Sequence, residues 1–337
     1  MRLRPRAPDG GPGPRFANPH LAGVTVGNHQ ASAALSAPRP LLSYARRETI
    51  ANYMYLLPAA ICLGGTVVFP ILKAMHMSLY HHVLIKPQDY RFIGLGNYVH
   101  MVNDPVFWLS LKNSIVWVFG AVTLQFIFGF AVALVLNAKF RGRAVFRTIN
   151  LLPWIIPGVV VALIWEYIYQ PNYGPLNDLL RRAGLMREPV AWLSEFNLAM
   201  PAVIFTNIWR GIPFFTIMIL AGLQAIPDEV YEAATVDGAA VLQRFWSITL
   251  PMLRPIIVVA TATRIIWTFN YADLIFVMTG GGPANATQIT STYTLMQAYS
   301  DLDWGYAAAL SVVLLLIMLV FTACYLKISK GVESVAG

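Results

Sequence analysis

Charged residues are scarce in this sequence. Asp, Glu, Lys and Arg together make up 12% of its 337 residues, whereas 57% of them are hydrophobic. In ordinary soluble domains about one residue in four is charged. A chain of this length with so few charges cannot cover a water-soluble surface. The composition therefore predicts an integral membrane protein with several spans.

Cysteine is almost absent, with two residues in the whole chain. Cys62 and Cys324 both lie within apolar runs, so neither a disulfide framework nor a zinc site is expected. His76, His81 and His82 lie close together, but no carboxylate or cysteine accompanies them at ligand spacing. No metal site is therefore predicted.

Two further signals are missing. The chain has no Gly-x-x-x-x-Gly-Lys-Ser/Thr phosphate loop, so it cannot cradle ATP by that route. It also lacks a compact charged-then-apolar leader with a cleavage site, and its first apolar run is too long to be one. The net charge of +8 does not indicate a nucleic-acid partner, because the basic residues cluster beside apolar runs.

Long apolar runs dominate the sequence. A helix needs about 20 apolar residues to cross the hydrocarbon layer. Six runs have this length, so we predict an all-α integral membrane protein with six transmembrane helices. The predicted spans are Tyr53 to Met77, Ile115 to Leu136, Ile149 to Tyr169, Leu198 to Leu223, Ile256 to Met278, and Trp304 to Tyr325. Between the third and fourth spans, Tyr173 to Trp192 predicts a short external helix.

The segments outside these spans predict the domain organisation. Residues 1–48 are rich in Pro, Gly, Ala and Arg without apolar periodicity, which indicates a disordered tail. Residues 49–330 would form the membrane domain, and residues 331–337 a short C-terminal tail. Lys and Arg are more frequent in the loops on the side of the N-terminus, and most of those on the other side have acidic neighbours. This bias predicts that both tails are cytoplasmic.

The most distinctive segment is a polar insert between the fourth and fifth runs. It reads EAATVDGAAVLQRFWSITLPMLRP from Glu232 to Pro255. Pro227 suits a first helical turn, Asp237 can cap a second helix, and Gly238 permits a tight turn between the two. We therefore expect two small helices joined by a turn at Asp237–Gly238. Together they would form a surface that another protein can bind.

This insert resembles the EAA loop of ATP-binding-cassette (ABC) importer permeases. The matching residues are Glu232-Ala233-Ala234, Asp237-Gly238-Ala239, Phe245, Leu250-Pro251 and Pro255. Residues 92–98 (FIGLGNY), 104–108 (DPVFW), 279–283 (TGGGP) and 304–309 (WGYAAA) are similar to segments of the binding-protein-dependent, carbohydrate-type family. They resemble in particular the first permease subunit of maltose-type importers. The resemblance covers roughly residues 50 to 330 and leaves out the N-terminal tail.

The resemblance implies a type I ABC importer permease fold and a transport role, with no catalytic residue and no cofactor in this chain. It implies a second, different permease subunit, two cytoplasmic ATPase subunits that bind ATP and Mg, and an extracytoplasmic solute-binding protein. The chain would be a multi-pass protein of the prokaryotic plasma (inner) membrane. The EAA loop, within residues 225–255, would enter a cleft on one ATPase. Its coupling residues would be Asp228, Glu229, Glu232, Ala233, Ala234, Asp237 and Gly238.

Polar side chains gather in the fourth and fifth predicted spans, among them Arg210 and Asn270. Such groups are costly in lipid and usually face a cavity or a partner. Gly211 and Pro213 predict a break or kink in the fourth span. Alignment on the maltose-type permease implies sugar-contacting positions, most of which differ in residue type from that permease. They are Asn207, Gly211, Phe214, Arg264, Trp267, Thr268 and Tyr271.

Alternatives stay open from the sequence. Phe214 and Trp267 could pack helices together, and Arg264 could pair with Asp273 or with the partner permease. The substrate could be glycerol-3-phosphate or a polyol instead of a sugar. An ion-coupled secondary transporter would need a buried carboxylate relay and often shows an inverted repeat. Only Asp273 and Glu166 are candidates for such a relay, and no repeat is visible. An integral-membrane enzyme would need a nucleophile–base pair or metal ligands, and neither is present in the sequence.

Overall fold

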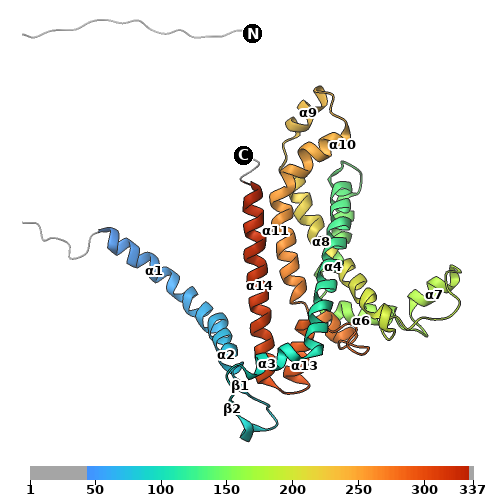
Figure 1. Cartoon of the computed structure of the whole chain (residues 1–337). Helices are drawn as coiled ribbons and strands as arrows, with labels where there is room; N and C mark the ends of the chain where they lie inside the picture. Colours follow the sequence, from blue (N-terminus) through green and yellow to red (C-terminus); the bar gives the residue numbers. More distant parts are fainter. Residues whose placement is uncertain (1–43, 334–337) are drawn as a thin grey trace, which may run out of the picture. The chain divides into compact units, whose positions relative to one another are not determined.

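The computed structural model describes residues 44–333, which are mostly helical (Figure 1). The predicted N-terminal tail falls almost wholly outside this range, as do residues 334–337. The helices are α1 Tyr44–Leu63, α2 Phe69–Met77, α3 Gly96–Asn103, α4 Pro105–Asn137, α5 Arg143–Ile155, α6 Gly158–Ile168, α7 Pro175–Arg182, α8 Phe196–Ala225, α9 Asp228–Val236, α10 Val241–Arg244, α11 Leu250–Phe269, α12 Asp273–Met278, α13 Thr290–Tyr299 and α14 Trp304–Glu333. Two π-helical turns, Gly64–Val68 and Phe245–Thr249, a 3-10 turn, Pro87–Asp89, and a hairpin of β1 Tyr80–His81 with β2 Arg91–Phe92 complete the described chain.

The chain divides into two units at Ala60, and every candidate site residue belongs to the second, which begins at Ile61. Within the described residues, five helical segments are long and apolar enough to cross a membrane, or six if the bent pair α5–α6 is counted as one span. The count agrees with the six predicted spans. The five segments are Asn52–Met77, Pro105–Asn137, Phe196–Ala225, Val241–Met278 and Trp304–Lys327.

The third predicted span, Ile149 to Tyr169, is not one straight helix. Helix α5 ends at Ile155, α6 begins at Gly158, and the two meet at an angle of 95°. Pro157 explains the break. It has no amide hydrogen to donate, and it disfavours helical dihedrals in the residue before it. Accordingly, Ile156 has extended dihedrals (φ −67°, ψ 131°). The prediction of a single helix here was wrong.

The fifth span is interrupted, whereas the fourth span is continuous. Helix α8 runs without interruption past both Pro201 and Pro213, so the chain is not broken at Gly211–Pro213. The fifth span is interrupted instead, because α11 ends at Phe269 and α12 begins at Asp273. The three residues between them, Asn270 to Ala272, are non-helical. Tyr271 therefore lies on a loop inside a span.

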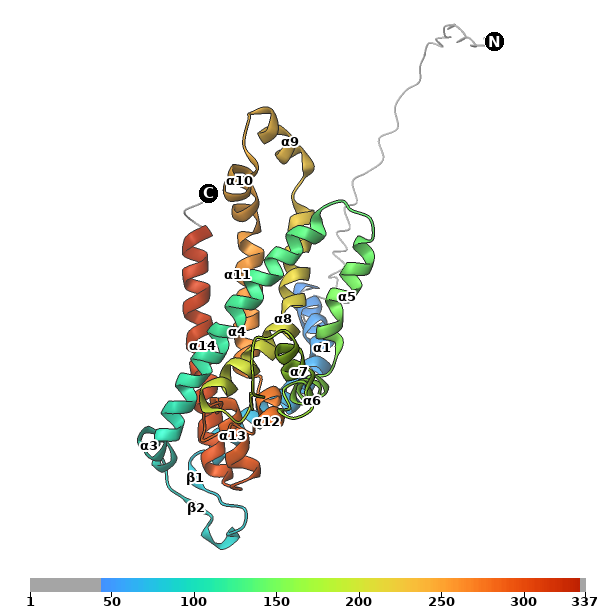
Figure 2. The ribbon, with the colours of Figure 1, turned by 90° about the vertical axis from the view of Figure 1, so that its right-hand side faces the viewer.

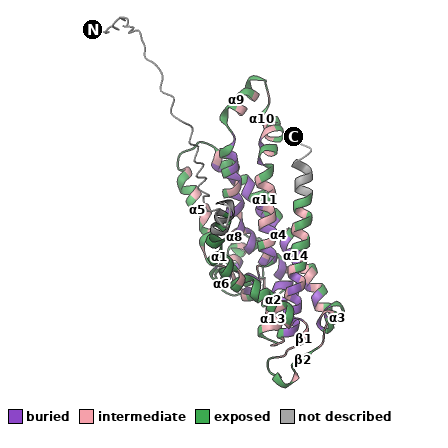
Figure 3. Cartoon of the chain, turned by 90° about the vertical axis from the view of Figure 1, so that its left-hand side faces the viewer, coloured by how far each residue is buried: buried purple, intermediate pink, exposed green. Residues whose placement is uncertain are grey.

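The core lies between α4 and α8. Trp117 of α4 and Phe215 of α8 are fully buried, as is Leu253 of α11. Gly129 permits the close approach of α4 and α8, because a Cβ on it would lie 2.6 Å from Cβ of Phe215. Small residues have the same role in many transmembrane helix pairs. Figure 3 shows buried residues along α4 and α8, whereas α9 and α10 are exposed or half-buried.

The two ends of this helical unit carry different structures. Helices α9 and α10 lie at one end of α8 and α11, while α7, α13 and the β1–β2 hairpin lie at the other (Figures 1 and 2). Helix α7 falls inside the segment from Tyr173 to Trp192 that was predicted to contain a short helix.

At the end that carries α13, a buried carboxylate joins three helices. Asp104, at the start of α4, accepts hydrogen bonds from the hydroxyls of Tyr293 on α13 (2.5 Å) and Tyr306 on α14 (2.7 Å). Its second oxygen caps α4 by accepting from the amide of Val106 (2.8 Å). This cluster ties the ends of the helices together at the surface opposite the insert.

Candidate functional site

A chain of hydrogen bonds crosses three helices in the middle of the core. The Nε of Arg264 on α11 donates to Oε1 of Gln125 on α4, at 2.7 Å. The Nε2 of Gln125 in turn donates to the backbone carbonyl of Asn207 on α8, at 2.8 Å. Arg264 is only 4% exposed, and Gln125 and Asn207 are fully buried. These bonds fix the position of a cationic side chain inside an apolar core.

Gly211 makes this arrangement possible. It lies one helical turn beyond Asn207 on α8, beside the hydrogen-bonded pair. A Cβ at this position would overlap both the side chain of Gln125 and Nη2 of Arg264. Glycine is therefore the residue that leaves room for an arginine and a glutamine to pack against the α8 backbone.

A cavity of about 370 Å³ opens beside Arg264. Its lining combines aromatic rings with polar groups, from α5, α8, α11 and the loop after α11. The lining residues are Trp154, Arg210, Arg264, Ile266, Trp267, Thr268, Asn270 and Tyr271.

Several buried polar atoms in this region have no hydrogen-bond partner among the described residues. They are Oγ1 of Thr268, the hydroxyl of Tyr271, Nε of Arg210, and both side-chain heteroatoms of Asn207. Buried polar atoms in proteins nearly always have a partner. The unsatisfied groups at the cavity can therefore donate hydrogen bonds to a polar ligand or accept them from it.

Aromatic contacts form another part of the site. The rings of Phe214 and Trp267 lie 5.4 Å apart, between centroids. The guanidinium of Arg264 lies 5.9 Å from the Phe214 ring, and that of Arg210 lies 4.9 Å from the Tyr271 ring. Such distances allow cation–π attraction, which also orients the cationic groups.

The structure brings the seven predicted substrate positions together. Arg264, Trp267, Thr268 and Tyr271 line the cavity, and Gly211, Phe214 and Asn207 lie against these residues or against Gln125. The alternative in which Arg264 pairs with Asp273 is wrong for this chain. None of the ion pairs among residues 44–333 includes either residue, and Arg264 bonds to Gln125 instead.

Two residues of this region, Gln125 and Trp154, were not predicted from the sequence. A signal for Gln125 exists, because a glutamine in the middle of an apolar span is expensive unless it has a buried partner. Trp154 could not have been identified from spacing, since it reaches the cavity only because the chain bends between α5 and α6.

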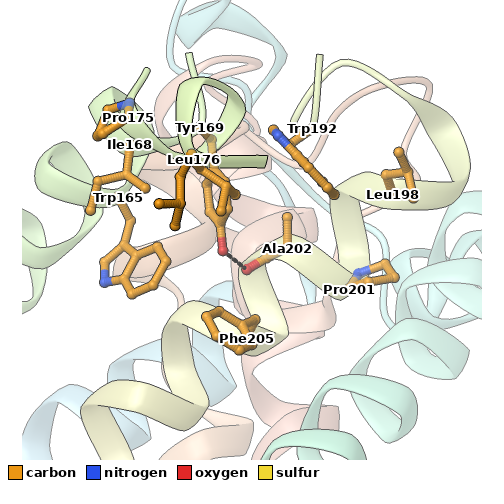
Figure 4. A pocket seen from close by; sticks show the side chains of 11 residues that line it. Trp165, Ile168, Tyr169, Pro175, Leu176, Trp192, Leu198, Pro201, Ala202 and Phe205 are labelled. Carbon is orange, nitrogen blue, oxygen red and sulfur yellow. Dashed lines mark hydrogen bonds between the residues drawn. The ribbon is translucent and has the colours of Figure 1, made fainter. Parts of the chain in front are cut away.

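A larger hollow, of about 530 Å³, lies between α6, α7 and the first turns of α8 (Figure 4). It is lined mainly by apolar side chains such as Trp165, Leu176 and Phe205. The hydroxyl of Tyr169 is already used, because it donates to the carbonyl of Ala202 at 3.0 Å. This hollow therefore offers a sugar few hydrogen-bonding groups, and the smaller cavity beside Arg264 is the better candidate.

The insert forms two helices, as predicted. Helix α9 ends at Val236, α10 begins at Val241, and Gly238 between them has φ +79°. The left-handed conformation is the one that glycine adopts without strain. Asp237, however, does not cap α10. It follows α9 directly, and the residue that precedes α10 is Ala240, because the turn is longer than predicted. Pro227 lies just before the first turn of α9.

A closed ring of hydrogen bonds braces the insert. The hydroxyl of Tyr231 on α9 bonds to Oγ1 of Thr249 (2.9 Å), which donates to the carbonyl of Arg244 (3.5 Å). Nη1 of Arg244 donates to Oγ1 of Thr235 (2.6 Å), and this hydroxyl donates to the carbonyl of Tyr231 (2.7 Å). The ring joins α9 to the π-helical turn that leads into α11.

The tip of the insert presents apolar and acidic side chains to the surroundings. Val236 is 88% exposed, Val241 75% and Leu242 69%. The predicted coupling carboxylates, Asp228, Glu229, Glu232 and Asp237, are exposed as well. None of them takes part in the ion pairs of residues 44–333. Exposed apolar groups that are rimmed by polar ones are typical of a protein-interaction surface.

Comparison with known proteins identifies the family and several relatives of this chain. Residues 125–334 match the family described as binding-protein-dependent transport system inner membrane component. The chain is 38% identical to a trehalose/maltose transport system permease protein of Thermococcus litoralis, over 84% of this chain and 95% of that protein. It is also 38% identical to the sulfoquinovosyl glycerol transport system permease protein of Agrobacterium fabrum, over 82% and 89% of the two chains.

The fold has a solved counterpart. It is similar to a chain in the crystal structure of a bacterial ABC transporter involved in the import of the acidic polysaccharide alginate. The TM-score is 0.74 with 24% sequence identity, and the match covers 85% of this chain and 97% of that one. The fold is therefore that of the type I ABC importer permeases.

Proposed function

This chain belongs to the family of binding-protein-dependent transport system inner membrane components, and we propose that it is one of two different permease subunits of an ATP-driven sugar importer. Members of the family are transport components and not enzymes. The names of two relatives, which specify trehalose/maltose and sulfoquinovosyl glycerol, support a sugar or a sugar derivative as the substrate.

The observation that carries the proposal is the cavity beside Arg264. It combines the rings of Trp154 and Trp267 with the unpartnered hydroxyls of Thr268 and Tyr271. A sugar has CH faces that stack on aromatic rings and hydroxyls that both donate and accept hydrogen bonds. The seven positions from Asn207 to Tyr271 named above would form this chain's half of the translocation path, and the second permease would supply the other half.

Coupling would take place at the insert. The exposed tip of α9 and α10 would enter a cleft on a cytoplasmic ATPase, which binds the ATP and Mg. Asp228, Glu229 and Glu232 would contact basic or backbone groups there. This arrangement requires the insert to be cytoplasmic, with both termini on the same side of the prokaryotic plasma membrane. The opposite end, with α7 and the β1–β2 hairpin, would then face the solute-binding protein.

The hydrogen-bond ring suggests how movement reaches the substrate. Because Tyr231 and Thr249 join α9 to the turn that leads into α11, a push on the insert is passed to α11. Helix α11 carries Arg264 and Trp267 at the cavity. Closure of the two ATPases would therefore rock α11 and open the path alternately to each side of the membrane.

Reconstitution tests this function. The chain would be placed in vesicles with a second permease, the ATPases and a binding protein, and uptake would be measured for a panel of sugars, polyols and glycerol-3-phosphate. Uptake of a sugar that requires both ATP and the binding protein is the expected result. Uptake of glycerol-3-phosphate or of a polyol alone would favour that alternative. Uptake by this chain without ATPases, driven by an ion gradient, would contradict the proposal.

A further inference from the structure

Two guanidinium groups, those of Arg210 and Arg264, line the same cavity, and among residues 44–333 no carboxylate lines it with them. The ion pairs among residues 44–333 are His81–Asp89, Arg91–Asp89 and Arg182–Asp178, so neither cavity arginine is paired within the described chain. The acid nearest in sequence to the lining, Asp273, is exposed at the start of α12 and makes no ion pair with them.

Most of the donors on these arginines are unused. A guanidinium has five N–H groups. Arg264 uses only Nε, and its acceptor is the amide of Gln125, which is neutral. Neither Nη1 nor Nη2 of Arg264 donates to a residue in the range 44–333. Arg210 makes no hydrogen bond in that range, and the Tyr271 ring beneath it also carries no charge. Within the part of the chain that the structure describes, both positive charges are therefore uncompensated, and terminal donors remain available.

Two uncompensated arginines would destabilise a site that binds only neutral sugars. A buried charge without a counter-charge is strongly destabilising in an apolar environment, even after the protein relaxes around it. Neutral hydroxyls need no such charge, because amides and hydroxyls bind them equally well. Arginine is instead the side chain whose planar, forked donors match the paired oxygens of carboxylate and phosphate groups.

We propose that the imported sugar or polyol carries an anionic group, a carboxylate, phosphate or sulfonate, and that Arg264 and Arg210 bind this group. The proposal rests on the sugar-import function above and names the chemical class of its substrate. Gln125 would act as a positioning residue. Its hydrogen bond to Nε holds the guanidinium plane so that the two terminal nitrogens are left for the anion. The aromatic rings of Trp154 and Trp267 would contact the sugar ring.

The binding protein also selects substrates, so the test excludes it. Complexes of both permeases and the ATPases in lipid nanodiscs would be titrated with glucosylglycerol and with its 6-sulfonate, 6-phosphate and 6-carboxylate analogues. The analogues share one skeleton and differ in charge. We expect an anionic probe to bind at least about tenfold more tightly than the neutral one. Arg264→Gln should weaken anion binding by about 10- to 100-fold, as expected for loss of a charge-assisted contact, and should weaken binding of the neutral probe much less.

Matched variants separate charge from packing. Arg264→Lys keeps the charge but loses the fork, so it should retain part of the preference for anions. Arg210 is only half-buried, and Arg210→Gln should reduce anion binding in the same direction even if the Arg264 variants fail to assemble. Arg91→Gln, at an exposed arginine of the hairpin, should change nothing.

Three results would overturn the inference: equal binding of the neutral and charged probes, no binding of any anion, or equal losses for all probes in Arg264→Gln. The first would indicate that a carboxylate of the second permease neutralises the arginines. Failure of this inference can be distinguished from failure of the proposed function. ATP-driven uptake of neutral sugars without preference for anions would leave the importer function intact and remove only this inference.

Discussion

Arg264 and Gln125, which are 139 positions apart in sequence, are joined by a buried 2.7 Å hydrogen bond between Nε and Oε1. The bond links α11, which lines the candidate cavity, to α4, which does not. The orientation of the cavity arginine is therefore determined by a helix behind the site. This relationship gives a test of how the site is built.

Substitution of Gln125 by Leu should weaken both the fold and the site. It leaves Nε of Arg264 without an acceptor and removes the donor to the Asn207 carbonyl, and an unsatisfied buried group costs about 1–3 kcal/mol, or more when it is charged. The midpoint of thermal unfolding of the purified complex should fall. Gln224→Leu, at an exposed glutamine of α8, is the matched control and should leave it unchanged. Equal midpoints in both variants would show that the bond is unimportant.

Gly211→Ala should disable substrate binding. The added methyl group would overlap the amide of Gln125 and Nη2 of Arg264, so both side chains would have to shift and the hydrogen bond between them would be disturbed. We expect a loss of affinity and a loss of stability of about 1–3 kcal/mol. Gly120→Ala is the control, because its Cβ would meet only Ile204, at 3.4 Å. Substrate affinity would be measured by titration of the reconstituted complex. Equal affinities in Gly211→Ala and Gly120→Ala would contradict this prediction.

Tyr231→Phe should loosen the coupling insert without removing its docking surface. The variant loses the hydroxyl that bonds to Thr249 and so opens the hydrogen-bond ring. One such bond contributes about 0.5–1.5 kcal/mol. We expect ATP hydrolysis to continue while the number of sugar molecules moved per ATP falls by about two- to tenfold. Tyr299→Phe, at an exposed tyrosine of α13, should keep the native ratio.

The Asp104 cluster predicts a pH dependence of stability. Burial alone would raise the pKa of this carboxyl, but hydrogen bonds from Tyr293, Tyr306 and the backbone of Val106 outweigh it and hold the pKa below its ordinary 3.8. A lowered pKa contributes stability that is fully present above the unfolded value and is lost as the pH falls through the folded value. Burial and the bond to Asp104 also raise the pKa of Tyr293 above its ordinary value of 10, so this donor stays protonated into alkaline solution.

Unfolding of the native protein should therefore become easier below pH about 4, and Asp104→Asn should be less stable at neutral pH and lack this acid-side loss. Denaturation of the purified complex, followed at several pH values, measures both effects. Parallel pH profiles for the two proteins would show that Asp104 is not responsible.

Much of the fold was predictable because a membrane restricts it to long apolar helices. The lengths of the apolar runs identified the spans, and the left-handed Gly238 was predictable from the Asp-Gly pair in a polar segment. The break at Pro157 also had a local signal, since a proline inside a predicted helix ends or kinks it. The length of the apolar run alone does not reveal this break.

Contacts between distant segments were not predictable. The partner of Arg264 depends on the packing of α4 against α8, which brings Gln125 to it from another helix. The ring from Tyr231 to Thr249 likewise depends on the length of the turn after α9. That turn length also explains why the Asp237 cap was wrong. Sequence spacing located the polar residues of the site, but it could not identify their partners.

We propose that the insert couples ATP hydrolysis to transport, and Glu232→Ala tests this coupling. Sugar-stimulated ATP hydrolysis and uptake would be measured together in reconstituted complexes of native chain, Glu232→Ala, and the control Glu188→Ala, which removes an exposed carboxylate beyond α7. We expect hydrolysis and uptake to collapse together in Glu232→Ala while the subunits still reach the membrane, and both to persist in the control. Undiminished hydrolysis and uptake in Glu232→Ala would contradict the proposal.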